Sequence, residues 1–342
     1  MRLSDSLKRG IMKSGVGGIL NKFKIRSRRS TLFFEDIFSE YVMHCENNGK
    51  KKEMFNLAKK WASVSTQQLI PGWLKNVSDI SVFNLAANNV WTNVGLVEYF
   101  DGKKDDDIVY VTTKREFLTR ITGENEFMKG FFVGCVNGFF RKECDIVSSV
   151  QSRTECMYKI ILRKEEFKIG AKDKKKYDTL NYLPAAIGFS LQDALKKNIF
   201  QLKEKNRIYF RKRPISPTEN TIFHIISNEG PFLETVPEIS FNYFKDILLK
   251  GEEKRMLSML KTLLQCMGWG VVKILEDVSK IKIIIKSPPC GLQTEKENLV
   301  FIINVILGFL WTIDRRIVLG EWMESEKLID AEFILHAKKA SR

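Results

Sequence analysis

The chain has 342 residues, of which 44% are hydrophobic and 28% are charged, and its formal net charge is +15. This length allows two ordinary domains, and the composition is typical of a soluble globular protein and excludes a largely disordered chain. No apolar run is a good spanning helix of about 20 residues, and the N-terminus lacks the apolar core of about 7–15 residues that a secretory signal has. We therefore expect a cytoplasmic protein. Its positive charge predicts attraction to an anionic partner.

Residues 1–30 are predicted to be a basic flexible arm. They contain nine Lys or Arg against one acid, Asp5, and glycines at 10, 15, 17 and 18 would break a helix. Such an arm can contact nucleic acid or an anionic membrane surface, or it can be a solubilising tail, and composition leaves both open. The candidate anion-binding residues are Lys8, Arg9, Lys13, Lys22, Lys24, Arg26, Arg28 and Arg29.

Residues 31–165 alternate between helical and strand-like periodicity. A helix is expected from Ser30, which would cap it, and a second from about 52 to 70. Strands at 94–100 and 108–113 surround an acidic turn that starts at Asp101 and Gly102 and continues through the polar residues 103–107. A glycine-punctuated helix in 126–140 and strands near 144–150 and 157–162 complete a first unit.

A charged and helical linker is expected over 166–204, followed by a second unit over 205–342. Its predicted helices cover 239–249, 256–267 and 299–313, and its strands cover 271–275, 281–285, 317–322 and 331–335. The segment 207–214, RIYFRKRP, has the basic and aromatic mixture of a single-strand nucleic-acid site. It also fits an ordinary strand with Ile208 and Phe210 inward.

The two units have the same predicted order, which suggests a repeat. Gly134 precedes Tyr158 by 24 residues, and Gly308 precedes Phe333 by 25. One inserted residue over this length is typical of two diverged copies. Periodicity therefore predicts a tandem α+β fold.

Two pairs of segments resemble the 4-vinyl-reductase-type domain family, which is related in fold to TRAPP vesicle-tethering subunits and haem-NO-binding-like domains. They are GFFVGCVNGFF (130–140) with ECMYKII (155–161), and ILGFLWTI (306–313) with DAEFIL (330–335). The resemblance implies that each repeat is a small antiparallel sheet packed with helices, and that the two form an internal pseudo-dimer. Members of this family bind small hydrophobic ligands, take part in tetrapyrrole metabolism or serve as dimerising scaffolds.

The resemblance also implies a metal position. In the sensory branch of the family, cysteines and a glutamate hold a structural zinc; Cys135 and Cys156 match two of those positions, and Cys144 is an additional thiol. Positions 148, 149 and 151 hold Ser, Ser and Gln, which are poor zinc ligands, so the zinc site is incomplete. The alternative is that all three thiols are buried small hydrophobes.

The sequence lacks the common catalytic signatures, including phosphate loops and the zinc-protease and nucleophile-elbow motifs. We therefore expect a non-enzymatic ligand-binding or scaffolding module in a larger protein assembly, with protein partners or self-association. The alternatives are a cofactor- or tetrapyrrole-linked enzyme partner and an adaptor that binds nucleic acid or an anionic membrane through its arm. A hydrophobic ligand would be lined by residues that could equally be core: Phe131, Phe132, Cys135, Phe139, Trp91 and Tyr158.

Overall fold

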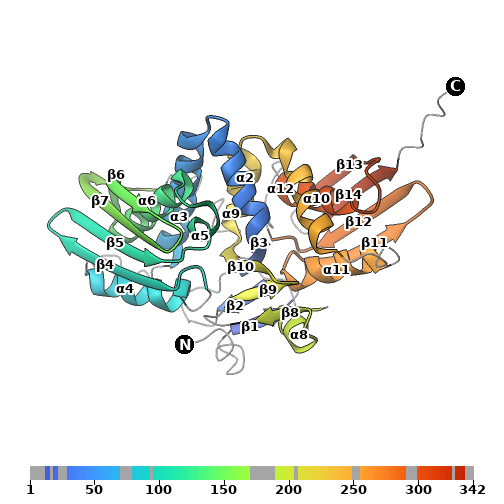
Figure 1. The fold of residues 1–342 in the computed structure, drawn as a ribbon, viewed down its shortest axis with the longest axis horizontal. Coiled ribbons are helices and arrows are strands. Elements are labelled where there is room, and N and C mark those ends of the chain that lie inside the picture. The colour runs from blue at the N-terminus through green and yellow to red at the C-terminus, as the bar shows by residue number, and fades with distance from the viewer. Residues whose placement is uncertain are drawn as a thin grey trace.

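A computed structural model shows an α+β protein with three antiparallel sheets (Figure 1). It describes residues 12–15, 18–21, 29–69, 79–92, 95–169, 189–203, 207–248, 255–289, 299–325 and 328–335. The expected α+β class, with small antiparallel sheets packed against helices, is confirmed at this level. None of the helices in these ranges combines the length and apolar character that a membrane span requires.

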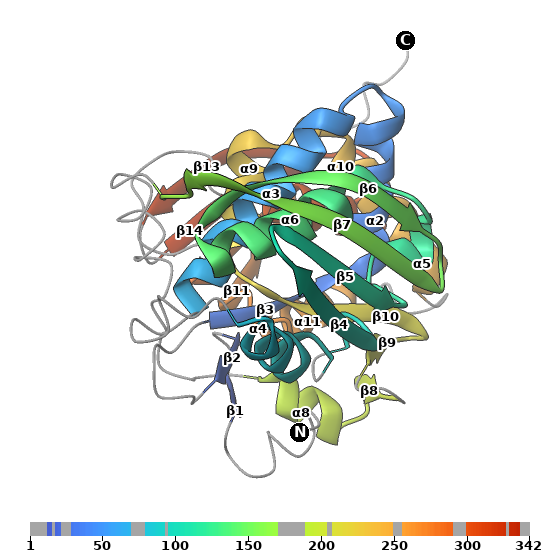
Figure 2. The same ribbon diagram turned by 90° about the vertical axis from the view of Figure 1, so that its left-hand side faces the viewer.

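The first half is a four-stranded sheet with helices on its inner side (Figure 2). The sheet has the order β4-β5-β7-β6, and α6 packs tightly against α3. The elements are α2 (Glu35–Asn47), α3 (Lys51–Leu69), α4 (Ile80–Ala87), η2 (Asn88–Thr92), β4 (Tyr99–Asp105), β5 (Ile108–Lys114), α5 (Thr119–Thr122), α6 (Glu126–Phe140), β6 (Lys142–Gln151) and β7 (Glu155–Glu166).

The second half has the corresponding order of strands, β11-β12-β14-β13, and α12 packs against α10 as α6 packs against α3. In both halves, the register of the edge hairpin shifts. β6 has shifts between Lys142 and Cys144 and between Ile146 and Ser148, and β13 has one between Leu319 and Trp322. The elements are α9 (Thr221–Glu229), η4 (Leu233–Thr235), α10 (Val236–Ile247), α11 (Met256–Cys266), β11 (Val271–Glu276), β12 (Lys280–Lys286), α12 (Val300–Leu310), β13 (Ile317–Ser325) and β14 (Leu328–Leu335).

A six-stranded sheet joins the two halves, and its order is β1-β2-β3-β10-β9-β8. At its centre, β3 and β10 pair antiparallel, so that Phe34 lies opposite Ile215 and Ser30 opposite Glu219. Each half contributes three strands. The strands are β1 (Met12–Gly15), β2 (Gly18–Asn21) and β3 (Arg29–Phe34) from the first, and β8 (Phe200–Leu202), β9 (Ile208–Phe210) and β10 (Arg213–Glu219) from the second. A short helix, α8 (Leu191–Lys196), precedes β8.

Two predicted boundaries are wrong. The chain from 29 to 34 is strand β3 and the first helix begins at Glu35, so Ser30 is not its cap. Periodicity along 30–45 cannot detect a strand partner about 180 residues away, and the pairing with β10 overrides the local signal. The turn between β4 and β5 lies at 106–107, with Gly102 inside β4, where Asn84 of α4 bonds both its N–H (2.7 Å) and its C=O (2.9 Å).

Three glycines on α6 explain how closely this helix approaches α3. A Cβ atom added at Gly130, Gly134 or Gly138 would lie 2.1, 2.3 or 2.6 Å from a backbone oxygen of α3. Real Cβ atoms do not come that close to an oxygen, so only glycine permits this approach of the two backbones. At Gly308 on α12, an added Cβ would similarly lie 2.3 Å from the carbonyl oxygen of Pro237 on α10.

Candidate functional site

Four of the six residues predicted to line a ligand site form one aromatic cluster in the first half. Trp91 on η2 lies 5.5 Å from Phe131 on α6, measured between ring centroids, and Phe131 lies 5.3 Å from Phe132. Phe132 in turn lies 4.7 Å from Tyr158 on β7. The three α6 and β7 rings are buried and Trp91 is half-buried, so these side chains fill the space between the sheet and its helices.

The remaining two predicted lining residues lie further along α6. Phe139 contacts Phe83 of α4 with 4.9 Å between the ring centroids, and Phe83 links it to Trp91 at 6.2 Å. Cys135 is buried, and burial raises the pKa of its thiol. All six side chains therefore belong to the packed interior of the first half, and their role as a ligand lining stays a prediction.

Glu116, which sequence reasoning missed, lies at the base of this cluster. Its carboxylate accepts hydrogen bonds from the Thr113 hydroxyl, the Thr119 hydroxyl (2.5 Å) and the Tyr158 hydroxyl (2.9 Å). Gln151 donates to the same Tyr158 oxygen at 2.9 Å. The exposed fraction of Glu116 is 0%, so its acceptor positions are met from inside the protein.

Burial governs the ionisation of this carboxyl and phenol. It raises the pKa of Glu116, which the three hydroxyl donors oppose, and it raises the pKa of Tyr158 well above its ordinary value. The arrangement holds the Tyr158 ring in place against Phe132. No sequence signal distinguished Glu116, because it follows the exposed Arg115 just beyond the end of a predicted strand.

The structure does not bring the three candidate zinc ligands together. Cys144 lies opposite Leu162 on β7, six residues from Cys156, which corresponds to roughly 20 Å along the strand. The thiols of Cys144 and Cys156 donate to nearby carbonyls, of Lys142 (3.2 Å) and of Ser152 (3.4 Å) respectively. Burial raises the pKa of Cys144 to about 12 and of Cys156 to about 11. Within the described ranges, no three His, Cys, Asp or Glu residues are grouped so that they could hold a metal ion.

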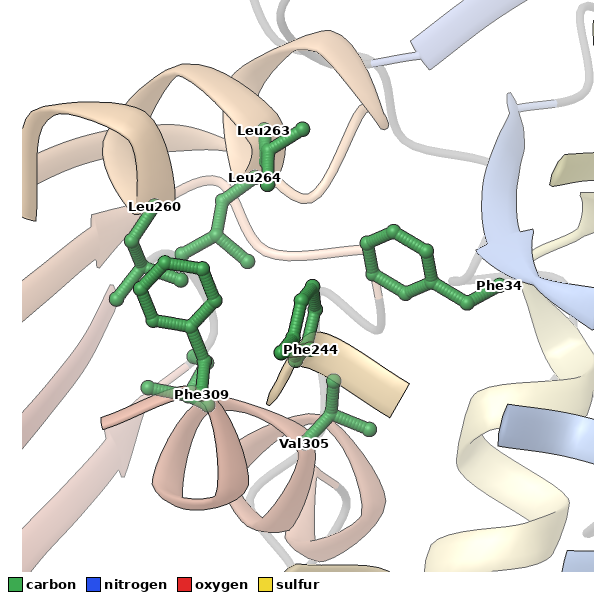
Figure 3. Close-up of a pocket in the computed structure, with 8 residues that line it drawn as sticks. Phe34, Phe244, Leu260, Leu263, Leu264, Val305 and Phe309 are labelled. Carbon is green, nitrogen blue, oxygen red and sulfur yellow. The ribbon is translucent and has the colours of Figure 1, made fainter. Parts of the chain in front are cut away.

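A small cavity lies in the second half rather than beside the aromatic cluster (Figure 3). Its volume is about 10 Å³, and it lies between α10, α11, α12 and the end of β3. A cavity of this size has room for one water at most, and a water requires polar partners, which this lining does not supply. The lining residues are Phe34, Phe244, Leu260, Leu263, Leu264, Val305, Ile306 and Phe309.

Polar contacts at the junction tie the halves together. Glu35 at the start of α2 is 1% exposed, and it accepts hydrogen bonds from both the Arg120 guanidinium of α5 and the Ser216 hydroxyl of β10. Beside it, Asp36 pairs with Arg213 of β10 at 3.0 Å. Burial raises the pKa of Asp36 against the lowering effect of Arg213, and burial lowers the pKa of Arg120.

Of the candidate anion-binding residues, Lys13 lies on β1 and Arg29 on β3. The other six, Lys8, Arg9, Lys22, Lys24, Arg26 and Arg28, lie outside the described residues. In the 207–214 segment, the ordinary-strand interpretation is confirmed for its apolar residues, since Ile208 and Phe210 are 0% and 3% exposed.

Comparison of the chain with protein-family models, with curated proteins and with solved structures finds no match. The resemblance to 4-vinyl-reductase-type domains therefore stays a prediction. It depends on the two glycine-containing helices and the strands that follow them.

Proposed function

We propose that this protein is a non-enzymatic scaffold made of two degenerate 4-vinyl-reductase-like repeats, packed as an internal pseudo-dimer that works within a larger protein assembly. The observation that carries the proposal is the matching order of strands in the two halves, β4-β5-β7-β6 and β11-β12-β14-β13, on either side of the antiparallel pair β3 and β10. An antiparallel pair of equivalent strands is the arrangement expected at a two-fold axis.

The helix contacts support the same equivalence. An added Cβ at Gly134 would lie 2.3 Å from the carbonyl oxygen of Lys59 and 2.8 Å from the Cβ of Ala62, three residues on. At Gly308, the distances are 2.3 Å to the carbonyl oxygen of Pro237 and 2.5 Å to the Cβ of Ser240, again three residues on. A shared contact of this detail supports common descent of the two halves.

The ladder register supports an alignment of the repeats that differs by two residues from the Tyr158–Phe333 match expected from the spacing. Ile146 pairs with Ile160 just before the second irregularity in β6, and Leu319 pairs with Phe333 just before the one in β13. Phe333 therefore corresponds to Ile160, and Ala331 corresponds to Tyr158. The second half has no phenol in that place, so the Glu116–Tyr158 pair belongs to the first half alone.

A scaffold requires surfaces for partners, and the outer faces of the two four-stranded sheets, at opposite ends of the molecule (Figure 1), are well placed for this. On the first sheet, Val150 of β6 and Met157 of β7 are directly opposed and are 62% and 52% exposed. On the second, Met323 of β13 is 70% exposed. Exposed apolar side chains that adjoin on a sheet are typical of protein contact surfaces.

The test compares partner recovery by two double variants. The test variant places two charges on the first outer face, through Val150→Lys and Met157→Lys. The control variant places two charges at exposed apolar positions on α2 and α4, through Met43→Lys and Leu85→Lys. Partners of the unaltered protein are identified by co-purification from the native cell and quantified for each variant. We expect loss of a stoichiometric protein partner with the sheet variant only. Equal recovery with both variants, or no stoichiometric partner for the unaltered protein, would contradict the scaffold proposal.

A further inference from the structure

The net charge of the chain is confined to two segments. Residues 1–30 contain nine Lys or Arg and one Asp, and residues 170–213 contain twelve Lys or Arg and four Asp or Glu. The remaining residues contain 35 Lys or Arg and 36 Asp or Glu. The two halves are thus close to neutral outside these segments, which together account for the whole excess of positive charge.

The fold brings the described parts of the two basic segments to one end of the molecule. The first supplies β1 and β2, and the second supplies α8, β8 and β9, all in or beside the central sheet. Although β1 and β8 are at opposite edges of this sheet, α8 lies against β1. Figure 1 shows these five elements together at the lower edge, away from the two outer sheets. We name this end, formed by β1, β2 and the described residues of 189–213, the basic end.

Several lysines of the basic end are exposed. Lys196 and Lys197 lie at the end of α8, Lys203 follows β8, and Lys212 lies in the turn between β9 and β10. Since Phe200 pairs with Phe210, the turn that holds Lys212 is beside the end of α8. The β8 strand between Lys197 and Lys203 spans only about 10 Å, so the backbone positions of the four lysines lie close together.

Two arginines of the same segment have internal roles and are not part of this surface. Arg211 donates to the carbonyl oxygen of Ile247 at 3.0 Å, and Arg213 pairs with Asp36. Substitution of the lysines therefore tests binding at this surface without disturbing the junction between the halves.

We propose that the basic end binds nucleic acid through its phosphate backbone, without sequence preference. Clustered lysines on an otherwise neutral protein attract a polyanion and release its counterions. A half-buried ring, Tyr209 on β9, lies beside them with the Lys203 Nζ 4.7 Å from its centroid, and a base can stack next to such a ring. Among the described residues of 189–213, no large hydrophobic side chain is exposed, whereas a membrane-binding surface inserts apolar side chains.

The experiment measures binding of the full chain to a fluorescein-labelled oligo(U) RNA of about 20 nucleotides by anisotropy across a salt series. The test variant carries Lys196→Glu, Lys197→Glu, Lys203→Glu and Lys212→Glu. The matched control carries the same charge change at four exposed lysines of the first half, Lys51, Lys52, Lys103 and Lys104. We expect the test variant to bind at least about tenfold more weakly than the control and to reduce the slope of log K against log salt by roughly 3.

Three results would overturn the proposal. They are absence of RNA binding by the unaltered chain at low salt, equal weakening by the two variants, and binding to phosphatidylserine-containing vesicles without binding to RNA. If the charge-reversed protein does not fold, the Lys→Gln version of the same four positions replaces it. It removes the same four phosphate contacts, so the slope should again fall by roughly 3 relative to a Lys→Gln control. The outcome is independent of partner recovery at the outer sheets, so this proposal and the scaffold proposal can fail separately.

Discussion

Phe33 and Phe34 are adjacent on β3, and they pack into opposite halves of the molecule. The Phe33 ring lies 5.1 Å from Phe38 and 5.6 Å from Phe117, both in the first half. The Phe34 ring lies 5.2 Å from Tyr243 and 5.1 Å from Phe244, both in the second. Successive side chains of a strand point to opposite faces, so one strand belongs to both cores. The two halves are therefore coupled through β3.

The first prediction follows from this shared strand. Phe33→Ala and Phe34→Ala should each lower the free energy of unfolding by about 3–5 kcal/mol, because each removes a buried ring and leaves a cavity. Both substitutions should shift the same single unfolding transition in urea. This transition is monitored by tryptophan fluorescence and by far-UV circular dichroism. Leu85→Ala, at a residue 65% exposed, is the control and should change the free energy by less than about 0.5 kcal/mol. Two separate transitions, one sensitive to each substitution, would show that the halves unfold independently.

The second prediction concerns the helix contacts. Alanine normally stabilises a helix by about 1 kcal/mol relative to glycine, but Gly134→Ala and Gly308→Ala should each destabilise the protein by about 1–3 kcal/mol. The reason is the 2.3 Å approach of an added Cβ to a backbone oxygen, which forces the helices apart. The melting temperatures of the two glycine variants are compared with that of a control, Asn56→Ala, which changes an exposed residue of α3. A rise in the melting temperature of either glycine variant would show that the helices are not in such close contact.

The third prediction is a pH dependence caused by Glu116. Because burial raises its folded pKa above the ordinary value of 4.5, the unfolded state releases this proton first as pH rises. The stability that the protonated carboxyl contributes is fully present below about pH 4.5 and decreases as pH rises toward the folded pKa. The free energy of unfolding of the native chain should therefore fall, relative to Glu116→Gln, as pH rises above about 4.5. Parallel profiles for the two proteins would mean that the folded pKa is not raised.

The fourth prediction concerns the buried ion pair at the junction. Arg120→Met leaves the carboxylate of Glu35, which is 1% exposed, without its guanidinium and should cost about 3–5 kcal/mol of unfolding free energy. Glu35→Gln combined with Arg120→Met removes both charges and should cost less than Arg120→Met alone. Urea denaturation of the single and double variants measures the difference. If the double variant is as unstable as the sum of the two single variants, the two side chains do not interact.

Local pattern predicted the helices that carry a buried stripe and strong boundaries. The helix expected at 256–267 is α11 (Met256–Cys266), and the one expected at 52–70 is α3 (Lys51–Leu69). The local pattern of 221–226 fits either a strand or the start of a helix, and the segment forms α9 (Thr221–Glu229). Hydrophobic periodicity succeeds for long amphipathic segments because the period of the helix is imposed on residues that are close in sequence.

Pattern also located the aromatic cluster but not the polar group beneath it. The positions of Phe131, Phe132 and Tyr158 followed from an apolar run and an alternating strand, both of which are local signals. Glu116 is charged and lies in a turn-like context, so composition predicts that it is exposed. Only the convergence of Thr113, Thr119 and Tyr158 on its carboxylate makes burial possible, and that convergence requires the folded sheet.

The sequence by itself determined the α+β class, the long helices and the presence of two basic segments, because these depend on composition and on residues a few positions apart. Tertiary structure decided that residues 29–34 form a strand, that Phe33 and Phe34 serve different cores, and that β1, β2, α8, β8 and β9 form one basic end. The physical reason is the same in each case. A strand requires a partner to satisfy its backbone hydrogen bonds, and here the partner of β3 comes from residues about 180 positions later, beyond the reach of any local pattern.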